Sequence, residues 1–317
     1  MVVLKVQVQK VEDSSVANIE DGILKITEPQ AQAYYDAADE LYDMYVEAVD
    51  YIIDNDLFFD VGVPFNLVEA IKKSWENDVH WHIFGRFLFS GGIEGETLTL
   101  QGFDADAPHY LLETALEQYE LLKAKGLDTE AQYNEVYEKV SDNFKRLITL
   151  MDDTALFEER YDGWRILFSS LAENEADEKA VRFLQQMADD AGFETEFEYL
   201  QNVHFGEDGI GLNDEEEFEY WYKHFKWSEM AHDEPELLVT LTNIMKNQKA
   251  IILNPAYTAV FESEGILKIL RQLYPDSPYL SDIEVDNSKP QAHVIFAYEA
   301  CGLGFVQDDT FIAHSLV

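Results

Sequence analysis

The sequence has one cysteine, Cys301, and few basic residues. A single cysteine cannot form an internal disulfide, which fits a reducing compartment. Only 22 lysines and arginines stand against 63 aspartates and glutamates, so the net charge is −41 at pH 7. Because sequence-independent binding to DNA or RNA needs lysine and arginine against phosphate, this charge argues against direct nucleic-acid binding. An anionic membrane surface is disfavoured for the same reason.

Long apolar runs are also missing. No stretch of about 18 apolar residues is present, so no transmembrane helix is predicted. The opening MVVLKVQVQKVED is too short, and too polar in its second half, for a signal peptide. We therefore expect a cytoplasmic protein, or one incorporated into an assembly made in the cytoplasm. No Gly-Lys-Ser/Thr follows Gly91-Gly92, so these glycines are interpreted as a turn and not as a phosphate loop.

Hydrophobic residues make up 47% of the 317 residues, enough to bury the core of one large or two medium domains. Apolar residues from Ala38 to Ile52 recur every three or four positions, which predicts a long helix with one acidic face. The aromatic cluster Tyr220, Trp221, Tyr222, Phe225 and Trp227 is interpreted as core in preference to a recognition surface.

Further patterns predict the order of the other elements. Alternation at residues 2–11 predicts a strand, and Gly91-Gly92 divides a predicted hairpin at 84–104. A strand, a helix and a strand at 164–170, 175–191 and 195–200 have the spacing of a parallel β-α-β unit. Other helices are predicted at 110–125, 129–150 and 256–274, and the acidic run 214–219 is interpreted as a solvated loop.

Several short motifs, in order along the chain, resemble those of the glutathionylspermidine synthases. Gly85-Arg86-Phe87 resembles the family's "G-R-F-D", and residues 103–108 (FDADAP) resemble its "Y-N-A-D-T-P". Asn254-Pro255-Ala256-Tyr257 resembles "E-P-A-W", and Gly302-Leu303-Gly304-Phe305 resembles "G-I-G-I-R-E". The resemblance covers most of residues 30–317 and implies an α/β fold with a pre-ATP-grasp-like domain and a truncated ATP-grasp remnant.

The resemblance implies a division into four parts. Residues 1–29 would form an N-terminal strand or arm, and 30–160 the helical and hairpin part of the pre-ATP-grasp domain. Residues 161–215 would form the β-α-β unit, and 216–317 the truncated ATP-grasp-like remnant. Only Lys289-Pro290 remains of the family's "K-P-x-x-R-E-G" loop, and the 28 residues after it are too few for an ATP-grasp lid.

Family members use ATP to activate the glycine carboxylate of glutathione as an acyl phosphate and join it to an amine. That chemistry needs oxygen ligands for divalent metal, cationic side chains for the phosphates and a glycine-rich loop. Arg86 stands at the family's phosphate-stabilising position. The alternative for Arg86 is a buried salt bridge to Asp104 or Asp106. Asp106 itself is equally compatible with a turn or a helix cap.

Other family positions are replaced. Leu88 and Gly102 stand where the resemblance implies metal-binding carboxylates, so Asp104 alone remains as a weak metal ligand. Glu264 stands at the position of the nucleotide-binding lysine, and Val306 at that of an arginine. No cofactor-binding residue is therefore predicted at either position.

Two constellations outside these motifs were weighed. His80 and His82 form an H-x-H that would suit a metal on a strand, but a half-buried histidine pair without a third ligand is the favoured interpretation. Cys301 with His293 or His314 would suit a nucleophile, but no motif positions a base or an oxyanion hole.

The leading hypothesis is a non-catalytic pseudoenzyme, a structural or interaction protein that binds a protein partner or assembles with itself, conceivably in a virion. No cofactor is expected for it. One alternative is an ATP- and Mg²⁺-dependent C–N ligase with a rearranged site at Arg86, Asp104 and Asp106. The other is an acidic nucleic-acid mimic, which requires acidic side chains along one face at phosphate-like spacing.

Overall fold

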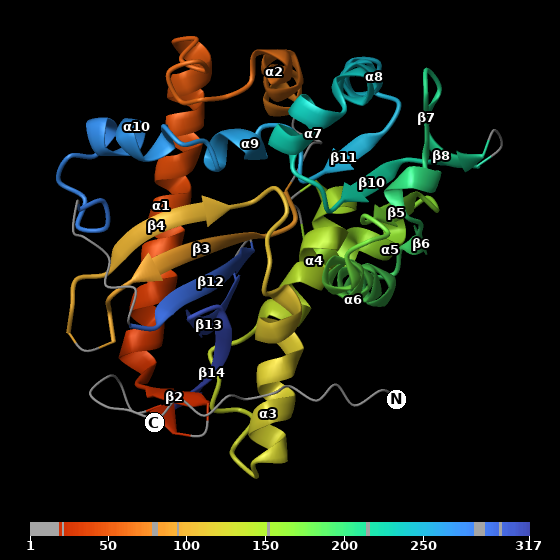
Figure 1. Cartoon of the computed structure of the whole chain (residues 1–317). Helices are drawn as coiled ribbons and strands as arrows, with labels where there is room; N and C mark the ends of the chain where they lie inside the picture. Colours follow the sequence, from red (N-terminus) through yellow and green to blue (C-terminus); the bar gives the residue numbers. More distant parts are fainter. Residues whose placement is uncertain are drawn as a thin grey trace.

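The computed structural model describes residues 19–20, 22–77, 82–93, 95–150, 153–213, 216–281, 289–297 and 300–317. The strand predicted at 2–11 lies outside these residues. The described chain has an α/β fold, as predicted, in which a seven-stranded sheet and a four-stranded parallel sheet lie side by side (Figure 1). No helix in these ranges is long and apolar enough to cross a membrane.

The seven-stranded sheet brings together segments from both ends of the sequence. Its order is β1 (Ile19–Glu20), β2 (Ile23–Ile26), β14 (Thr310–Leu316), β13 (Ala300–Gln307), β12 (Gln291–Ala297), β3 (Gly85–Ser90) and β4 (Thr99–Asp104). β2 and β14 are parallel, and all other neighbours in this sheet are antiparallel. The β3–β4 pair confirms the predicted hairpin, and Gly91 and Gly92 both have positive φ angles in the segment between the two strands.

Helix α1 (Glu28–Asp54) crosses one face of this sheet (Figure 1). It starts with a capping box in which Thr27 and Gln30 satisfy each other's free backbone groups, and Pro29 lies in its first turn. Its apolar stripe is buried against sheet residues such as Phe87, Phe89 and Phe103. The predicted long helix is therefore confirmed, and its acidic face is exposed.

The four-stranded sheet is parallel throughout, in the order β11 (Ile251–Leu253), β10 (Tyr220–Lys223), β5 (Arg165–Ser169) and β6 (Glu194–Phe197). Helix α6 (Glu175–Ala191) connects β5 to β6, which confirms the predicted β-α-β unit. Asn174 caps α6 by accepting hydrogen bonds from the amides of Ala176 and Asp177. The aromatic cluster on and after β10 is core: Tyr220, Trp221, Tyr222 and Trp227 are buried.

The remaining elements cover these sheets. They are α2 (Val68–Glu76), α3 (Gln118–Ala124), α4 (Val136–Thr149), α5 (Phe157–Arg160), α7 (Trp227–Asp233), α8 (Pro235–Lys246), α9 (Thr258–Phe261) and α10 (Ile266–Leu273). Short 3₁₀ or π turns lie at η1 (Phe65–Leu67), η2 (Glu113–Glu117), η3 (Thr154–Leu156) and η4 (Leu200–Asn202). A third sheet joins β7 (His204–Gly206), β8 (Gly209–Asn213) and β9 (Glu216–Phe218).

Tertiary contacts changed three of the predicted elements. The acidic run 214–219 was predicted as a loop, but Glu216–Phe218 forms β9 because Phe218 is buried opposite Ile210. The helix predicted at 256–274 is broken into α9 and α10. At the break, Gly265 approaches Val61 so closely that a Cβ atom would lie 2.5 Å from its Cα. The helix predicted at 129–150 begins only at Val136, because Tyr133 and Asn134 bond to the seven-stranded sheet.

Both sheets cross the boundaries suggested by the sequence. Residues 216–317, predicted as one remnant, supply β10 and β11 to the parallel sheet and β12–β14 to the seven-stranded sheet. Helix α4 packs on both the seven-stranded sheet and α6, within a hydrophobic core that includes Phe144, Phe168 and Ile295. The two sheets are therefore joined through one continuous apolar layer.

Candidate functional site

The candidate site lies where the end of β4 meets the end of β10. Arg86 on β3 is directly opposite Asp104 on β4, and the guanidinium lies 3.6 Å from the carboxylate. Both side chains are mostly buried, with 17% and 13% of their surfaces exposed. This is the buried salt bridge to Asp104 that the sequence analysis considered as the alternative role of Arg86. The Arg86 guanidinium also lies over the ring of Tyr110, 5.4 Å from its centre.

Glu262 and Lys226 extend this pair into a network. The Lys226 ammonium donates to Glu262 over 2.7 Å, and the other oxygen of Glu262 accepts the backbone N–H of Asp106 over 3.0 Å. Burial and a hydrogen bond with Asp104 raise the pKa of Glu262 to about 9. Burial opposes ionisation of Asp104, but this hydrogen bond and the charges of Lys226 and Arg86 lower the pKa of Asp104. The two carboxyl groups therefore share a proton, held by Glu262, near neutral pH.

A second ion pair, fully enclosed, lies beside the first. The buried Lys223 ammonium donates to Asp106 over 2.5 Å, and neither side chain exposes more than 1% of its surface. The second carboxylate oxygen of Asp106 accepts the backbone N–H of Trp227 over 2.6 Å. The Asn254 side chain binds the backbone carbonyl of Asp106 and the amide of Ile83. Asp106 thus connects the two sheets, and neither its carboxylate nor Lys223 is open to a ligand.

The positions that the resemblance assigns to metal-binding carboxylates lie on the open side of the hairpin. Leu88 and Gly102 are directly opposite each other on β3 and β4, two residues along from Arg86 and Asp104. Both are partly exposed, and a Cβ atom on Gly102 would meet nothing within 4 Å. Packing therefore does not require glycine at position 102.

The other predicted positions do not converge on this point. Glu264 is exposed at the break between α9 and α10, whereas Glu262, two residues earlier, reaches Asp104. Val306 lies on β13, paired with Gln291 and Phe311 of the neighbouring strands. Lys289 forms an ion pair with Glu96. Sequence reasoning assigned no role to Lys223, Lys226 or Glu262, which lie at the end of β10, just before α7 and just after α9.

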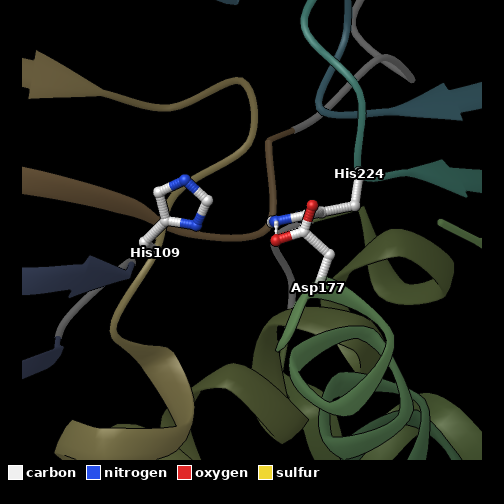
Figure 2. A group of neighbouring side chains, drawn as sticks. All are labelled: His109, Asp177 and His224. Atoms are coloured by element: carbon white, nitrogen blue, oxygen red, sulfur yellow. Dashed lines mark ion pairs between the residues drawn. The ribbon is translucent and has the colours of Figure 1, made fainter. Parts of the chain in front are cut away.

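Three further polar side chains meet beside this network (Figure 2). His109 follows β4, Asp177 lies in the first turn of α6, and His224 follows β10. One possible ligand atom from each lies within 4.8 Å of the others. The His224 Nε2 atom lies 3.6 Å from an oxygen of Asp177. These residues are far apart in the sequence and have no motif spacing, so sequence reasoning missed them.

The histidines that the sequence singled out have structural partners. His82 is buried next to the hydroxyl of Tyr257, 3.4 Å away, and burial lowers its pKa to about 4. His293 is bonded to Thr114, and His314 accepts the backbone N–H of Tyr133. Cys301 lies in β13, but its side chain is outside the described part of the chain, as is His80.

Comparison with known proteins points to one family. The model of the glutathionylspermidine synthase pre-ATP-grasp family matches residues 5–299. A putative acid–amine ligase of Haemophilus influenzae is 24% identical over 216 residues, which cover 67% of this chain and 50% of that protein. The chain therefore spans about half the length of this curated relative.

A solved structure supports the same fold. The apo form of a glutathione synthetase-like effector from Globodera pallida superimposes with a TM-score of 0.55 at 9% identity, covering 93% of this chain and 89% of that one. At this identity the likeness concerns the fold alone. Because the family model matches almost the whole chain, and the Arg86 hairpin, Asp106 and the Asn254 segment fall at the junction of the two sheets, this protein belongs to the glutathionylspermidine synthase pre-ATP-grasp family.

Proposed function

We propose that this chain is a non-catalytic member of its family that uses the pre-ATP-grasp scaffold to bind a protein partner. The observation that carries the proposal is the Leu88–Gly102 pair on the open side of the hairpin. A Mg²⁺ ion that bridges phosphates needs several oxygen ligands. At this place the Asp104 carboxylate is already paired with Arg86, and the neighbouring Glu262 carboxyl group holds a proton near neutral pH.

The residues present therefore do not fit Mg²⁺ and ATP in the manner of the family. Arg86 already faces the Asp104 carboxylate at 3.6 Å, which competes with a phosphate for the charge of the guanidinium. Asp106, which the rearranged-ligase alternative would use, has both carboxylate oxygens occupied by Lys223 and the amide of Trp227. The relative from Haemophilus influenzae carries a ligase name, but this chain spans only half of it, so the proposal concerns the shared half alone.

Titration calorimetry with Mg²⁺ and ATP tests the proposal. We expect no saturable heat from the wild-type protein at millimolar ligand. The double variant Leu88→Asp/Gly102→Glu restores a pair of carboxylates beside Asp104, and we expect it to gain saturable Mg²⁺ binding. Micromolar, Mg²⁺-dependent ATP binding by the wild-type protein would overturn the proposal and favour the ligase alternative.

The exposed face of α1 is the surface we propose for the partner. It carries a band of exposed acidic residues, namely Asp36, Asp39, Glu40, Asp43, Glu47, Asp50 and Asp54. Apart from the adjacent Asp39 and Glu40, successive members are three or four residues apart, which corresponds to roughly 4.5–6 Å along a helix. Phe59 and Phe65, in the segment after α1, are 91% and 93% exposed and offer apolar contact area to a partner. A basic surface with an apolar pocket is complementary to this combination.

Size-exclusion chromatography of the protein mixed with an extract of its source organism tests this surface. We expect the wild-type protein to elute well above its monomer mass of 36.5 kDa at low salt. Phe59→Ser/Phe65→Ser and the charge-reversal variant Asp36→Lys/Asp43→Lys should both elute nearer to the monomer. Elution of the wild type as a monomer at every salt concentration would remove the support for a partner.

The same acidic band supports the second candidate, a nucleic-acid mimic. The two candidates differ in the partner that they predict: a nucleic-acid mimic binds a protein that otherwise binds DNA or RNA. If the partner is a nucleic-acid-binding protein, duplex DNA should displace this chain from it, with an effect that weakens as salt rises. If DNA does not displace this chain from its partner, the mimic is excluded and the non-catalytic scaffold protein remains.

A further inference from the structure

The group formed by His109, Asp177 and His224 is not explained by the proposed function. The three side chains come from the loop after β4, from the first turn of α6 and from the end of β10, so they connect the two sheets (Figure 2). Figure 2 shows the His109 ring and the Asp177 carboxylate facing the His224 imidazole. His224 is buried, Asp177 is partly buried and His109 is exposed, so the group opens to solvent on one side.

His224 has an unmet hydrogen-bonding need. Its side chain is only 3% exposed, yet Nε2 has no hydrogen-bond partner among the described residues. The other ring nitrogen, Nδ1, lies 3.5 Å from the hydroxyl of Tyr222. When Nδ1 carries the proton, Nε2 directs a lone pair at the Asp177 carboxylate 3.6 Å away. In that tautomer two acceptors face each other in a buried place, an arrangement that a cation bound between them satisfies.

The Asp177 carboxylate is held in position by the cap of α6. Asn174 donates from its side-chain nitrogen to one oxygen of Asp177 over 2.7 Å, while its own oxygen accepts the amides of Ala176 and Asp177. The other oxygen of Asp177 is left facing His224. Supporting contacts of this kind, from Asn174 to the carboxylate and from Tyr222 to the imidazole, orient ligands at protein metal sites.

The place in the fold also suits a ligand. From β5 the chain proceeds to β6 on one side, while β10 and β11 lie on the other side, so the strand order reverses between β5 and β10. Ligands in open parallel sheets bind at the carboxyl ends of the strands at such a reversal. His224 follows β10 there, and its backbone amide donates to Ser169 at the end of β5. The hydroxyl of Ser170, next along, is buried without a partner.

We propose that His109, Asp177 and His224 bind a first-row transition metal, with Zn²⁺ as the best match. Two imidazoles and one carboxylate favour zinc or its neighbours over Mg²⁺ and Ca²⁺, which prefer oxygen alone. Bonds of about 2.0–2.2 Å in a tetrahedral site put neighbouring ligand atoms roughly 3.3–3.5 Å apart. The 3.6 Å between His224 and Asp177 is near this value, and the exposed His109 side chain can rotate to close the rest. A fourth position remains open to water or a partner's side chain.

Calorimetric titration of Zn²⁺ into the chelator-treated, tag-free protein tests the site. We expect saturable binding of one Zn²⁺ ion with micromolar or tighter affinity, and a rise in Tm that a chelator reverses. His109→Ala changes an exposed side chain and should fold normally, and it should bind Zn²⁺ at least tenfold more weakly. Asp177→Asn should weaken binding similarly while retaining an acceptor near the α6 cap.

The matched control is His232→Ala. His232 is also exposed and also lies beside an aspartate, Asp233, but outside the proposed site. This variant should bind Zn²⁺ with the affinity of the wild type. Excess Mg²⁺ should not displace Zn²⁺ from the wild-type protein. Co²⁺ provides an independent readout, because a four- or five-coordinate nitrogen and oxygen site gives strong visible absorption that the His109 variant should lose. Weak binding of many ions, or an equal loss in the His109 and His232 variants, would mean that the acidic surface alone binds the metal and would overturn the proposal.

Discussion

Two neighbouring ion pairs, whose aspartates Asp104 and Asp106 are two residues apart in the chain, have different surroundings. Asp106 and Lys223 are enclosed, with side-chain exposures of 1% and 0%, and the remaining oxygen of Asp106 has a backbone donor. In the other pair, the guanidinium of Arg86 and the carboxylate of Asp104 are 3.6 Å apart and both side chains are partly exposed. Among the described residues, Nε of Arg86 and one oxygen of Asp104 have no hydrogen-bond partner. The enclosed pair holds the two sheets together, whereas the open pair lies in the segments that resemble the family's "G-R-F-D" and "Y-N-A-D-T-P" motifs.

The comparison helps to explain which family positions persist in this chain. Asp106 matches the family motif, and its loss would leave a buried ammonium without a counter-charge. Leu88 and Gly102 depart from the motif on the open side, where a substitution disturbs little packing. A retained residue therefore indicates catalysis only when its surroundings leave it accessible, and Asp106 fails that condition.

The largest effect should come from the enclosed pair. Asp106→Ala should lower the free energy of unfolding by about 3–5 kcal/mol, because Lys223 then stays buried and unpaired. Asp104→Ala, the matched change in the less enclosed pair, should cost less, because Arg86 and Asp104 keep 17% and 13% of their side-chain surfaces exposed. Denaturant titration of both variants measures the difference. Equal losses would show that the two pairs are not distinguished by burial.

An intermediate effect should appear in the pH dependence of the open network. Folding raises the pKa of Glu262 from its ordinary 4.5 to about 9, through burial and the hydrogen bond with Asp104. Between these values the folded protein holds a proton that the unfolded chain has lost, so rising pH favours unfolding. Glu262→Gln keeps the neutral form at every pH.

The wild type should therefore lose stability relative to Glu262→Gln as pH rises. From about pH 6 to about pH 8 we expect a relative loss of roughly 2–3 kcal/mol, since each pH unit between the two pKa values contributes ~1.4 kcal/mol. Denaturant titrations of both proteins across this range provide the measurement. A pH-independent difference would show that Glu262 is ionised throughout.

The smallest effect should come from Gly102, and Gly302 in the same sheet provides the contrast. Gly102→Ala should change the free energy of unfolding by less than about 0.5 kcal/mol, because the new Cβ meets nothing within 4 Å. Gly302→Ala is the contrasting variant, since its Cβ would lie 2.1 Å from Val136, and it should cost about 1–3 kcal/mol. Thermal unfolding compares the two. A costly Gly102→Ala would mean that this face is less open than the geometry indicates.

Local patterns in the sequence predicted much of the fold. Periodicity located α1 and α6, and the glycine pair located the β3–β4 hairpin, because these elements depend on residues close in sequence. The family resemblance placed Arg86 and Asp106 at the candidate site. Local patterns failed where distant contacts decided the outcome, as at β9, which Phe218 anchors, and at Gly265, which Val61 approaches.

The composition of the site was less accessible to sequence reasoning. The partner of Asp106 is Lys223, 117 positions away, and no spacing rule connects them. Glu262 was passed over in favour of Glu264, because the motif comparison pointed at the exposed residue and only the fold shows which one reaches Asp104. His109, Asp177 and His224 become neighbours only when three elements meet.

The strand order of the larger sheet has a consequence for the timing of folding. Strands β12–β14 lie between β2 on one side and β3 on the other. During synthesis, the edge of β3 lacks its neighbour β12 until about 200 further residues have been made, since β12 begins only at Gln291. The edge of β2 waits for about 280 residues, since its neighbour β14 begins at Thr310. Contacts between such distant segments form slowly. The chain should therefore complete this sheet late in folding, and its exposed edges until then are natural targets for chaperones.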